Sequence, residues 1–283
     1  METGERVQAV SQFLLQSPPG EINDVLNDVR NIISDDESLQ AGVQPALREY
    51  NLAQFIVAEV PNSGHSSIVS EAAKVDGEED RFLDPRSKTS FKFDHISLEA
   101  SEPQDVESDP ESEPLRAALE KATLEYLKGH FTDGTASVFS VAQYPQQFVL
   151  QVVANKYNPS NYWSGRWRSE YSIDLEAKTI AGRILLNVHY YEQGNVQLET
   201  THKSSLTLPS TLDTTSPSSG SKIIALIAEQ ESAYQTSLGD TYHDMGEKTF
   251  KVLRRALPLT RQKIDWDKVL GYKLGAELSG SKG

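Results

Sequence analysis

The sequence predicts an α+β protein with an N-terminal antiparallel helix bundle, a small β-rich region and a five-stranded antiparallel sheet crossed by a long helix. Apolar residues recur with a helical period over the first fifty of the 283 residues. Strand-forming stretches separated by short turns fill residues 137–208, and one long helical pattern follows at 222–257. Because such turns leave no room for parallel crossover helices, we expect the strands to run antiparallel.

Three short amphipathic helices are expected to form the N-terminal bundle. They cover residues 5–16, 21–33 and 37–50, within a domain of residues 1–52. In the second helix, apolar side chains recur every three or four positions from Ile22 onward. The Pro18-Pro19-Gly20 break ends the first helix, whereas Pro45 lies inside the third and argues against an uninterrupted helix there. Short helices joined by tight turns favour an antiparallel bundle.

Residues 53–114 are expected to form a small β-rich region followed by an acidic linker. Thr89, Phe91, Phe93 and His95 share a period of two, which is typical of a strand with one buried face. Between residues 99 and 114 the chain has seven acids and three prolines. Because this composition cannot bury much apolar surface, we expect a solvated linker without strong internal order.

The third expected domain, residues 115–208, has one helix and the five strands of the sheet. The helix covers residues 115–128, and the strands are predicted at residues 138–142, 147–154, 170–175, 183–191 and 195–200. The strand at 183–191 is rich in Ile, Leu and Val and is expected to be outermost. An open edge must be charged, covered or paired, so this apolar strand predicts pairing with another chain.

A linker rich in Ser, Thr and Pro at 209–221 and a long helix at 222–257 make up the fourth domain, residues 209–257. The helix has an apolar stripe that includes Ile223, Ile227 and Leu238. We expect this stripe to lie across one face of the sheet.

The C-terminal tail, residues 258–283, differs in charge from the rest of the chain. Residues 251–273 have seven cations against two acids, in a protein of net charge −14. Pro258 predicts a break after the long helix, and Trp266, Leu270 and Leu274 form an apolar stripe beyond it. The tail is therefore predicted to contact an acidic partner. The alternative is a terminal helix that packs on the protein's own core.

Composition and motifs argue against several classes of protein. The chain has no cysteine, so disulfides and thiolate metal sites are excluded. No apolar run approaches the ~20 residues that a membrane span needs, and the N-terminus lacks a signal-peptide pattern, so a cytoplasmic protein is expected. The acidic balance argues against nucleic acid as a partner. Without a catalytic motif around His189 or His202, we expect no enzyme, no catalytic residues, no cofactor and no metal.

Tryptophan and arginine alternate in residues 163–168. Such a cluster can stack on nucleic-acid bases or make cation–π contacts within a fold. Because the whole chain is acidic, we favour a Trp-rich turn that fills the core or a subunit interface.

Several stretches together resemble the alpha subunit family of F-actin capping proteins. They are RFLDPR at 81–86, FKFDH at 91–95, WSGRWRSE at 163–170, VHYYEQGNVQL at 188–198 and FKVLRRALPLTRQKIDW at 250–266. The resemblance spans nearly the whole chain in the same order. Gln193 departs from the family, which usually has an acid at this turn position.

The resemblance implies a heterodimer with a capping protein beta subunit, in which each chain gives five strands to one continuous sheet. It also implies binding to the barbed end of an actin filament, where the heterodimer blocks subunit addition and loss. Phosphoinositides and capping regulators are further partners that it implies, with the cortical actin cytoskeleton of the cytoplasm as the location.

Functional positions are expected at two groups of residues. Actin binding is expected in the C-terminal tentacle and the helix before it, at Lys251, Arg254, Arg255, Arg261, Lys263, Trp266, Leu270 and Leu274. The subunit interface is expected at Trp163, Arg166, Trp167, Val188, His189, Tyr190 and Tyr191. The alternative function is a cytosolic scaffold or adaptor whose basic tail binds anionic lipid or an acidic protein.

Overall fold

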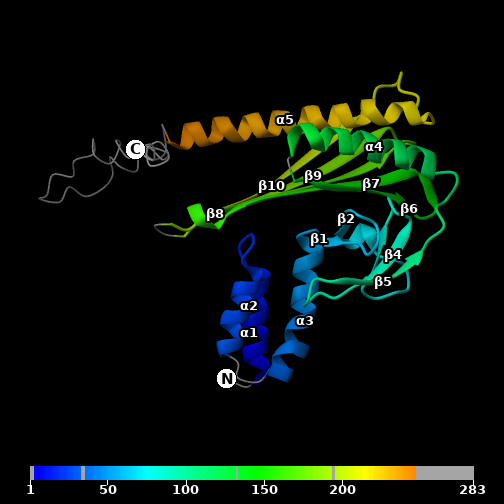
Figure 1. Ribbon diagram of the computed structural model, residues 1–283. Coiled ribbons are helices and arrows are strands. Elements are labelled where there is room, and N and C mark those ends of the chain that lie inside the picture. Colours follow the sequence, from blue (N-terminus) through cyan, green and yellow to red (C-terminus); the bar gives the residue numbers. More distant parts are fainter. Residues whose placement is uncertain (1–2, 33–35, 132, 193–194, 247–283) are drawn as a thin grey trace, which may run out of the picture. The chain divides into compact units, whose positions relative to one another are not determined.

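A computed structural model describes the protein at residues 3–32, 36–131, 133–192 and 195–246 (Figure 1). The chain forms two compact units, residues 1–230 and 231–283. The first unit contains the helix bundle, the small β-rich region and the sheet. In the second unit the structure describes residues 231–246, which are helical up to Asp244.

Three N-terminal helices confirm the predicted bundle. They are α1 (Thr3–Leu15), α2 (Ile22–Ile32) and α3 (Asp36–Ala53). Their shared core includes Val10, Leu14, Leu26, Val43, Leu47 and Tyr50. Gly42 lets α3 approach α1 closely, because a Cβ at this position would lie 2.3 Å from Val7 Cγ1. The predicted third helix is confirmed, and α3 continues through Pro45.

The small β-rich region contains a two-stranded and a three-stranded sheet. Strands β1 (Ile56–Glu59) and β2 (Ser66–Val69) form the first, and β3 (Arg81–Asp84), β4 (Thr89–Phe93) and β5 (Ala100–Asp105) form the second in that order. The prediction of a weakly ordered linker from residue 99 is wrong over β5, because its backbone pairs with β4 although its side chains are mostly exposed. The acidic composition of this stretch correctly indicates exposed side chains. It does not indicate that the backbone pairs with a neighbouring strand. A 3₁₀ turn, η1 (Glu71–Ala73), lies between the two sheets in sequence.

The predicted five-stranded antiparallel sheet is confirmed. Helix α4 (Glu113–His130) precedes β6 (Thr135–Val141), β7 (Tyr144–Asn158), β8 (Trp163–Asp174), β9 (Thr179–Tyr190) and β10 (Val196–Thr207). Their spatial order is β10-β9-β8-β7-β6, and every neighbouring pair is antiparallel. The short 3₁₀ turn η2 (Pro159–Asn161) follows β7. A second one, η3 (Pro217–Ser219), precedes the last helix.

Strand β9, which contains most of the predicted outer strand at 183–191, is an inner strand. It pairs with β8 on one side and with β10 on the other, so the prediction that it forms the edge is wrong. Its apolar composition reflects this inner position. The predicted strand 195–200 extends to Thr207 and pairs along the full length of β9, so β10 forms the edge.

One face of the sheet carries the main core of the first unit. Leu150, Val152, Tyr171, Ile173 and Ile180 pack there against residues of α4 and against the start of α5 (Gly220–Asp244). The predicted apolar stripe of α5 contributes Ile223 and Ile227 to this core, and Ile224 lies there as well. Among the helices in the described ranges, none is long and apolar enough to cross a membrane.

The edge formed by β6 is capped by two arginines. Arg86 Nη2 donates to the carbonyl of Ala136 at 3.0 Å, and Arg116 Nη1 donates to the carbonyl of Val138 at 3.2 Å. Arg116 is held in turn by Glu113 and Glu120. Because guanidinium groups occupy outward carbonyls of β6, this edge is protected from pairing with another strand.

Candidate subunit interface

All seven residues predicted for the subunit interface lie at one end of the sheet. Trp163, Arg166 and Trp167 belong to the first half of β8, whereas Val188, His189 and Tyr190 end β9 and Tyr191 follows. The strand register brings them together, with Trp163 opposite Tyr190. The predicted Trp-rich turn is therefore corrected to a strand, since residues 163–170 all pair with β7 and β9.

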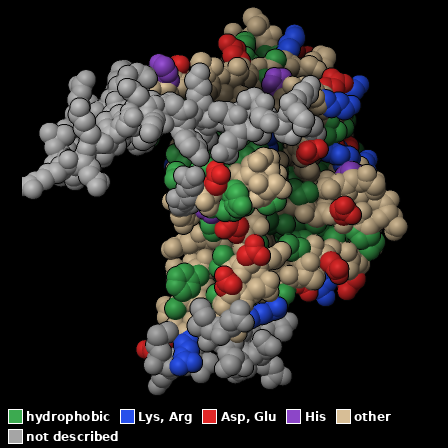
Figure 2. All heavy atoms as spheres, turned by 60° about the vertical axis from the view of Figure 1, so that its left-hand side comes forward, with side chains coloured by type: hydrophobic (Ala, Val, Ile, Leu, Met, Phe, Trp, Pro, Cys, Tyr) green, Lys and Arg blue, Asp and Glu red, His purple; other side chains and the backbone are tan. Residues whose placement is uncertain are grey.

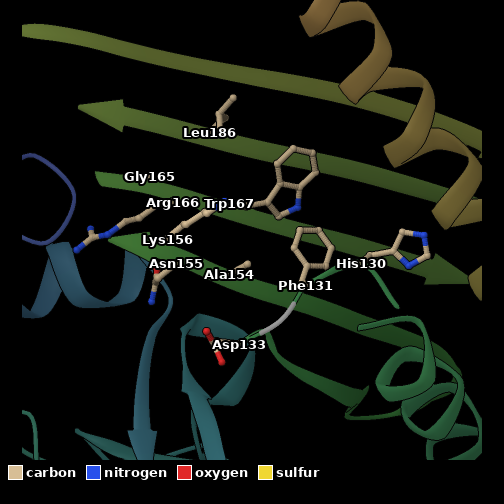
Figure 3. Close-up of a pocket in the computed structure, with 10 residues that line it drawn as sticks. All are labelled: His130, Phe131, Asp133, Ala154, Asn155, Lys156, Gly165, Arg166, Trp167 and Leu186. Atoms are coloured by element: carbon tan, nitrogen blue, oxygen red, sulfur yellow. The ribbon is translucent and has the colours of Figure 1, made fainter. Parts of the chain in front are cut away.

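Neighbouring residues of β8 face opposite sides of the sheet. Trp167 shares the face of Tyr171 and Ile173, which pack under α4, and its ring lies 5.9 Å from that of Phe131. Arg166 points to the other side, toward α3 (Figure 3). The same short stretch of strand therefore serves two different environments.

An open groove of about 470 Å³ lies on the face of Trp167 (Figure 3). Its apolar wall is formed by Phe131, Trp167 and Leu186, with Ala154 between the strands. Lys156, His130 and Asp133 add polar groups at the rim, where all three are exposed. Such a groove suits an apolar side chain with polar groups around it.

Arg166 is buried and joins three elements. Its Nη1 donates to the hydroxyl of Tyr50 at 2.6 Å and to Gln54 Oε1 at 3.2 Å, both on or just after α3. Its Nε donates to the hydroxyl of Tyr157 on β7 at 2.8 Å. The guanidinium also lies over the Tyr50 ring, 5.5 Å from its centre. Burial raises the pKa of the Tyr50 phenol, although the positive charge of Arg166 opposes this.

Arg168, two residues further along β8, is also buried. It donates to the carbonyls of Gln54 and Ala154 and to Asn155 Oδ1 at 2.8 Å. Burial lowers the pKa of Arg168 to about 10, and repulsion from Arg166 acts in the same direction. Both guanidinium groups stay charged at neutral pH. Within the described residues neither forms an ion pair with a carboxylate, so hydroxyl and carbonyl oxygens stabilise the two charges.

His189 is buried by contacts within its own chain. Its Nδ1 lies 2.6 Å from Glu21 Oε1, just before α2, and its Nε2 lies 3.0 Å from Asn195 Oδ1. The imidazole therefore ties the helix bundle to the loop between β9 and β10. Tyr191 packs beside it, with ring centres 4.9 Å apart.

Sequence reasoning missed three exposed side chains at the same end of the sheet. Tyr157, Tyr162 and Val196 are 44%, 47% and 63% exposed. Tyr157 and Tyr162 flank the Asn158-Pro159-Ser160 stretch, whose turn chemistry dominated the prediction there. Large side chains this exposed, gathered at one end of a sheet, are typical of an interaction surface.

The predicted actin-binding residues lie outside the described part of the chain. They are Lys251, Arg254, Arg255, Arg261, Lys263, Trp266, Leu270 and Leu274. Across residues 3–246, apart from the gaps, no group of three or more His, Asp or Glu side chains could hold a metal ion.

Comparison with known proteins gives a consistent match. The family model described as "F-actin capping protein alpha subunit" matches residues 10–277. The F-actin-capping protein subunit alpha of Emericella nidulans is 36% identical over 278 residues, which is 98% of each chain. That of Caenorhabditis elegans is 34% identical over 97% of each chain.

A solved structure shares the fold. It is that of the homodimeric actin capping protein alpha subunit from Plasmodium berghei, with a TM-score of 0.72 and 19% sequence identity. The match covers 91% of this chain and 99% of the other.

Proposed function

Because the chain belongs to the F-actin capping protein alpha subunit family, we propose that it caps actin filaments as one half of a heterodimer. The dimer binds the barbed end and blocks addition and loss of subunits. The observation that carries this proposal is the extent of the family match, which runs from residue 10 to residue 277 and so includes the basic tail. A scaffold with an unrelated fold would not match the family over this length.

The beta subunit is proposed to complete the sheet at the edge formed by β10. This edge differs from the other one, since arginines cap the outward carbonyls of β6. Among the described residues no strand lies beyond β10. A strand of twelve residues with a free edge is suited to backbone pairing with a second chain.

The groove beside Trp167 is proposed to receive apolar side chains of the beta subunit. Phe131, Trp167 and Leu186 provide its apolar wall, and Val188, Tyr190 and Tyr191 continue the surface toward the end of β9. Arg166 and His189 act as positioning residues, because their side chains hold this end of the sheet to the helix bundle. Trp163 shares the face of Trp167 on β8, and Lys156 Nζ lies 5.8 Å from the centre of its ring.

The basic tail is proposed to make the main contact with actin. Lys251, Arg255 and Arg261 meet acidic surface on the terminal protomers, with Arg254 and Lys263 beside them. Trp266, Leu270 and Leu274 lie on apolar surface. Asp and Glu side chains are scattered over the described face in Figure 2, so the body repels acidic surface that the tail attracts. When one chain of the heterodimer has bound the filament end, the other chain is held at a high effective concentration near it. The heterodimer is therefore released slowly from the filament.

We propose that the chain is organised into segments of residues 1–52, 53–114, 115–208, 209–257 and 258–283. The last segment is the actin-binding tentacle. The heterodimer is proposed to work in the cortical actin cytoskeleton of the cytoplasm. Phosphoinositides and capping regulators are proposed ligands of the same complex, which acts by steric occlusion and not as an enzyme.

Binding to filaments of different length tests the proposed function. The purified heterodimer is mixed with equal amounts of polymerised actin, before and after shearing. An end-binding protein saturates in proportion to the number of filament ends, so shearing should raise the bound amount severalfold. Saturation in proportion to actin subunits, with no effect of shearing, would contradict capping and favour a side-binding adaptor.

A further inference from the structure

The linker of residues 209–221 contains one of the two Ser-Pro steps in the chain. Of the 13 prolines, only Pro18 and Pro217 directly follow a serine, and none follows a threonine. Proline-directed protein kinases select a serine or threonine whose next residue is proline, and they bind that acceptor residue in an extended conformation. The chain therefore has two candidate acceptors for this class of enzyme, Ser17 and Ser216.

The backbone at Ser216 already has the extended form that such a kinase binds. Its φ is −88° and its ψ is 130°, as expected for a residue that precedes a proline. Thr215, Pro217 and Ser218 are exposed, and Ser216 itself is half-exposed. In Figure 1 these residues belong to the yellow loop that stands out from the start of α5. The acceptor hydroxyl thus lies in an open, extended stretch of chain.

Only local bonds hold this stretch in place. Every hydrogen bond that the described structure gives residues 211–218 joins partners at most three positions apart, such as the 3.0 Å bond from the Thr215 N–H to Asp213 Oδ1. Among these residues, Leu212 alone is buried in the main core. Because segments with few tertiary contacts open locally at low cost in free energy, a kinase can draw residues 213–218 into its cleft without disturbing the sheet.

Ser17, the other candidate acceptor, is held by the helix bundle. Its hydroxyl donates to the carbonyl of Phe13 at 3.2 Å, and its own carbonyl accepts from the Tyr50 hydroxyl at 3.4 Å. The same Tyr50 hydroxyl accepts from Arg166 of β8. Extension of the chain at Ser17 would break bonds where the bundle meets the sheet. The structure therefore distinguishes two steps that look alike in sequence.

We propose that Ser216 is a phosphorylation site for a proline-directed serine/threonine kinase. The kinase transfers the γ-phosphoryl group of ATP to Ser216 Oγ. A bond forms between this oxygen and the γ-phosphorus, and the bond from that phosphorus to the β,γ-bridging oxygen breaks. ADP leaves, and the proton of the serine hydroxyl is released.

The site lies at the opposite end of the sheet from the candidate interface. The linker follows the end of β10, where Thr207 pairs with Thr179, whereas the candidate interface lies where Val196 pairs with Tyr190. Contacts at the candidate interface therefore do not cover Ser216. Phosphorylation at this site does not depend on capping, so its absence would leave the proposed function intact.

A phosphate at Ser216 is expected to stabilise the start of α5. The turn η3 runs directly into α5, and Ser216 caps it, because its Oγ accepts from the Ser218 N–H at 3.3 Å. The first turn of α5 contains no acid. A phosphate adds about −1.5 to −2 charge and strong acceptor oxygens, which are favourable at the N-terminal end of a helix.

Kinase treatment of the folded full chain tests the site. The chain is incubated with ATP and a mitogen-activated protein kinase, and modified residues are identified by mass spectrometry. We expect phosphate at Ser216 and not at Ser17. Pro217→Ala keeps the acceptor hydroxyl but removes the apolar ring that the kinase recognises, so phosphorylation should slow about ten-fold. Ser17→Ala is the matched control and should be phosphorylated at the rate of the wild type.

A synthetic peptide of residues 209–222 separates the contributions of sequence and fold. Comparable phosphorylation of the peptide and of the folded chain would support the proposed site. If the peptide is modified and the folded chain is not, the fold hides the hydroxyl and the proposal is wrong. Absence of phosphate from both, or modification of the folded chain mainly at Ser17, would overturn it as well.

Thermal unfolding of the phosphorylated chain measures the effect on α5. The midpoint should rise by about 1 to 3 °C, because the added charge lies at the helix start. Ser216→Asp, which adds a single charge, should raise it less. Thr211→Asp adds the same charge at an exposed position further from α5 and should leave the midpoint unchanged. A midpoint lowered by phosphorylation would contradict the stabilising role of the phosphate.

Discussion

Arg166 and Tyr50 are 116 residues apart in the sequence, yet the guanidinium of Arg166 donates a 2.6 Å hydrogen bond to the Tyr50 hydroxyl. The bond joins α3 to β8 in the interior. The next residue of β8, Trp167, lines the groove on the opposite face of the sheet. The helix bundle therefore helps to fix the strand that shapes the candidate interface.

Replacing Tyr50 by Phe should destabilise the protein without altering its fold. The substitution removes an acceptor for a buried charged donor, and hydrogen bonds of charged groups contribute about 1.5 to 3 kcal/mol. We expect a loss of about 2 kcal/mol in the free energy of unfolding, measured by urea denaturation. Tyr144→Phe, at an exposed position on β7, is the matched control and should change little. Equal stability of the two variants would mean that the bond contributes nothing.

Acid should weaken the protein through His95. This side chain is buried, its Nε2 lies 3.3 Å from Asp80 Oδ1, and Asn51 Nδ2 lies 3.2 Å from its Nδ1. Burial lowers the pKa of His95 below 6.5, although Asp80 opposes this. Once the pH falls below about 6.5, the unfolded chain therefore binds more protons at this residue than the folded chain. The free energy of unfolding then decreases as the pH is lowered.

Thermal unfolding between pH 7.5 and 5.0 measures this effect. The wild type should lose stability below pH 6.5, and a His95→Gln variant should show a flatter dependence on pH. His130→Gln, at an exposed position of α4, should keep the slope of the wild type. Parallel slopes for the wild type and His95→Gln would contradict the prediction.

A side chain at Gly182 should disrupt the centre of the sheet. A Cβ there would lie 2.6 Å from the ring of Tyr171, which is fully buried, and 2.5 Å from Ser204 Oγ. Overpacking of this kind costs about 1 to 3 kcal/mol, so Gly182→Ala should lower the midpoint of urea unfolding. Gly129→Ala is the control, because no atom lies near its Cβ position and alanine suits a helix better. Unchanged stability of Gly182→Ala would show that Tyr171 can move aside.

Local patterns predicted most helices and strands, because each reflects a period in nearby residues. The apolar repeat from Ile22 onward identified α2, and the alternation from Thr89 to Phe93 identified β4. In sequence the first half of β8 resembles a turn, because serine, glycine and arginine lie between the tryptophans there. In the structure, oxygens on or just after α3 and on β7 accept hydrogen bonds from the two arginines. No local sequence pattern shows these long-range contacts.

The spatial order of the strands and the contacts between distant residues could not be predicted from the sequence. Both β9 and β10 could be identified as strands, yet nothing in either shows which is the edge. The contacts of His189 with Glu21 and of Arg166 with Tyr50 join residues more than a hundred positions apart. Such pairs are fixed by the packing of the bundle under the sheet and not by spacing in the chain.

Removing three cations of the tail should weaken capping. Lys251, Arg255 and Arg261 replaced together by Ala should cost about 1 to 2 kcal/mol per cation if each meets a carboxylate at a partly dried contact. The loss should appear largely as slower association that depends on salt. Binding rates at two ionic strengths measure it. Replacement of Lys121, Lys128 and Lys178, exposed or half-exposed cations of the body, is the matched control.

Seeded elongation of pyrene-labelled actin tests the central claim most directly. The heterodimer of this chain and a beta subunit should arrest growth from barbed ends at concentrations near that of the filament ends, far below that of actin. Truncation after Thr249, which removes the basic segment, should abolish most of this arrest. Undiminished elongation in the presence of the intact heterodimer would contradict capping, and equal arrest by the truncated form would contradict the role of the tail.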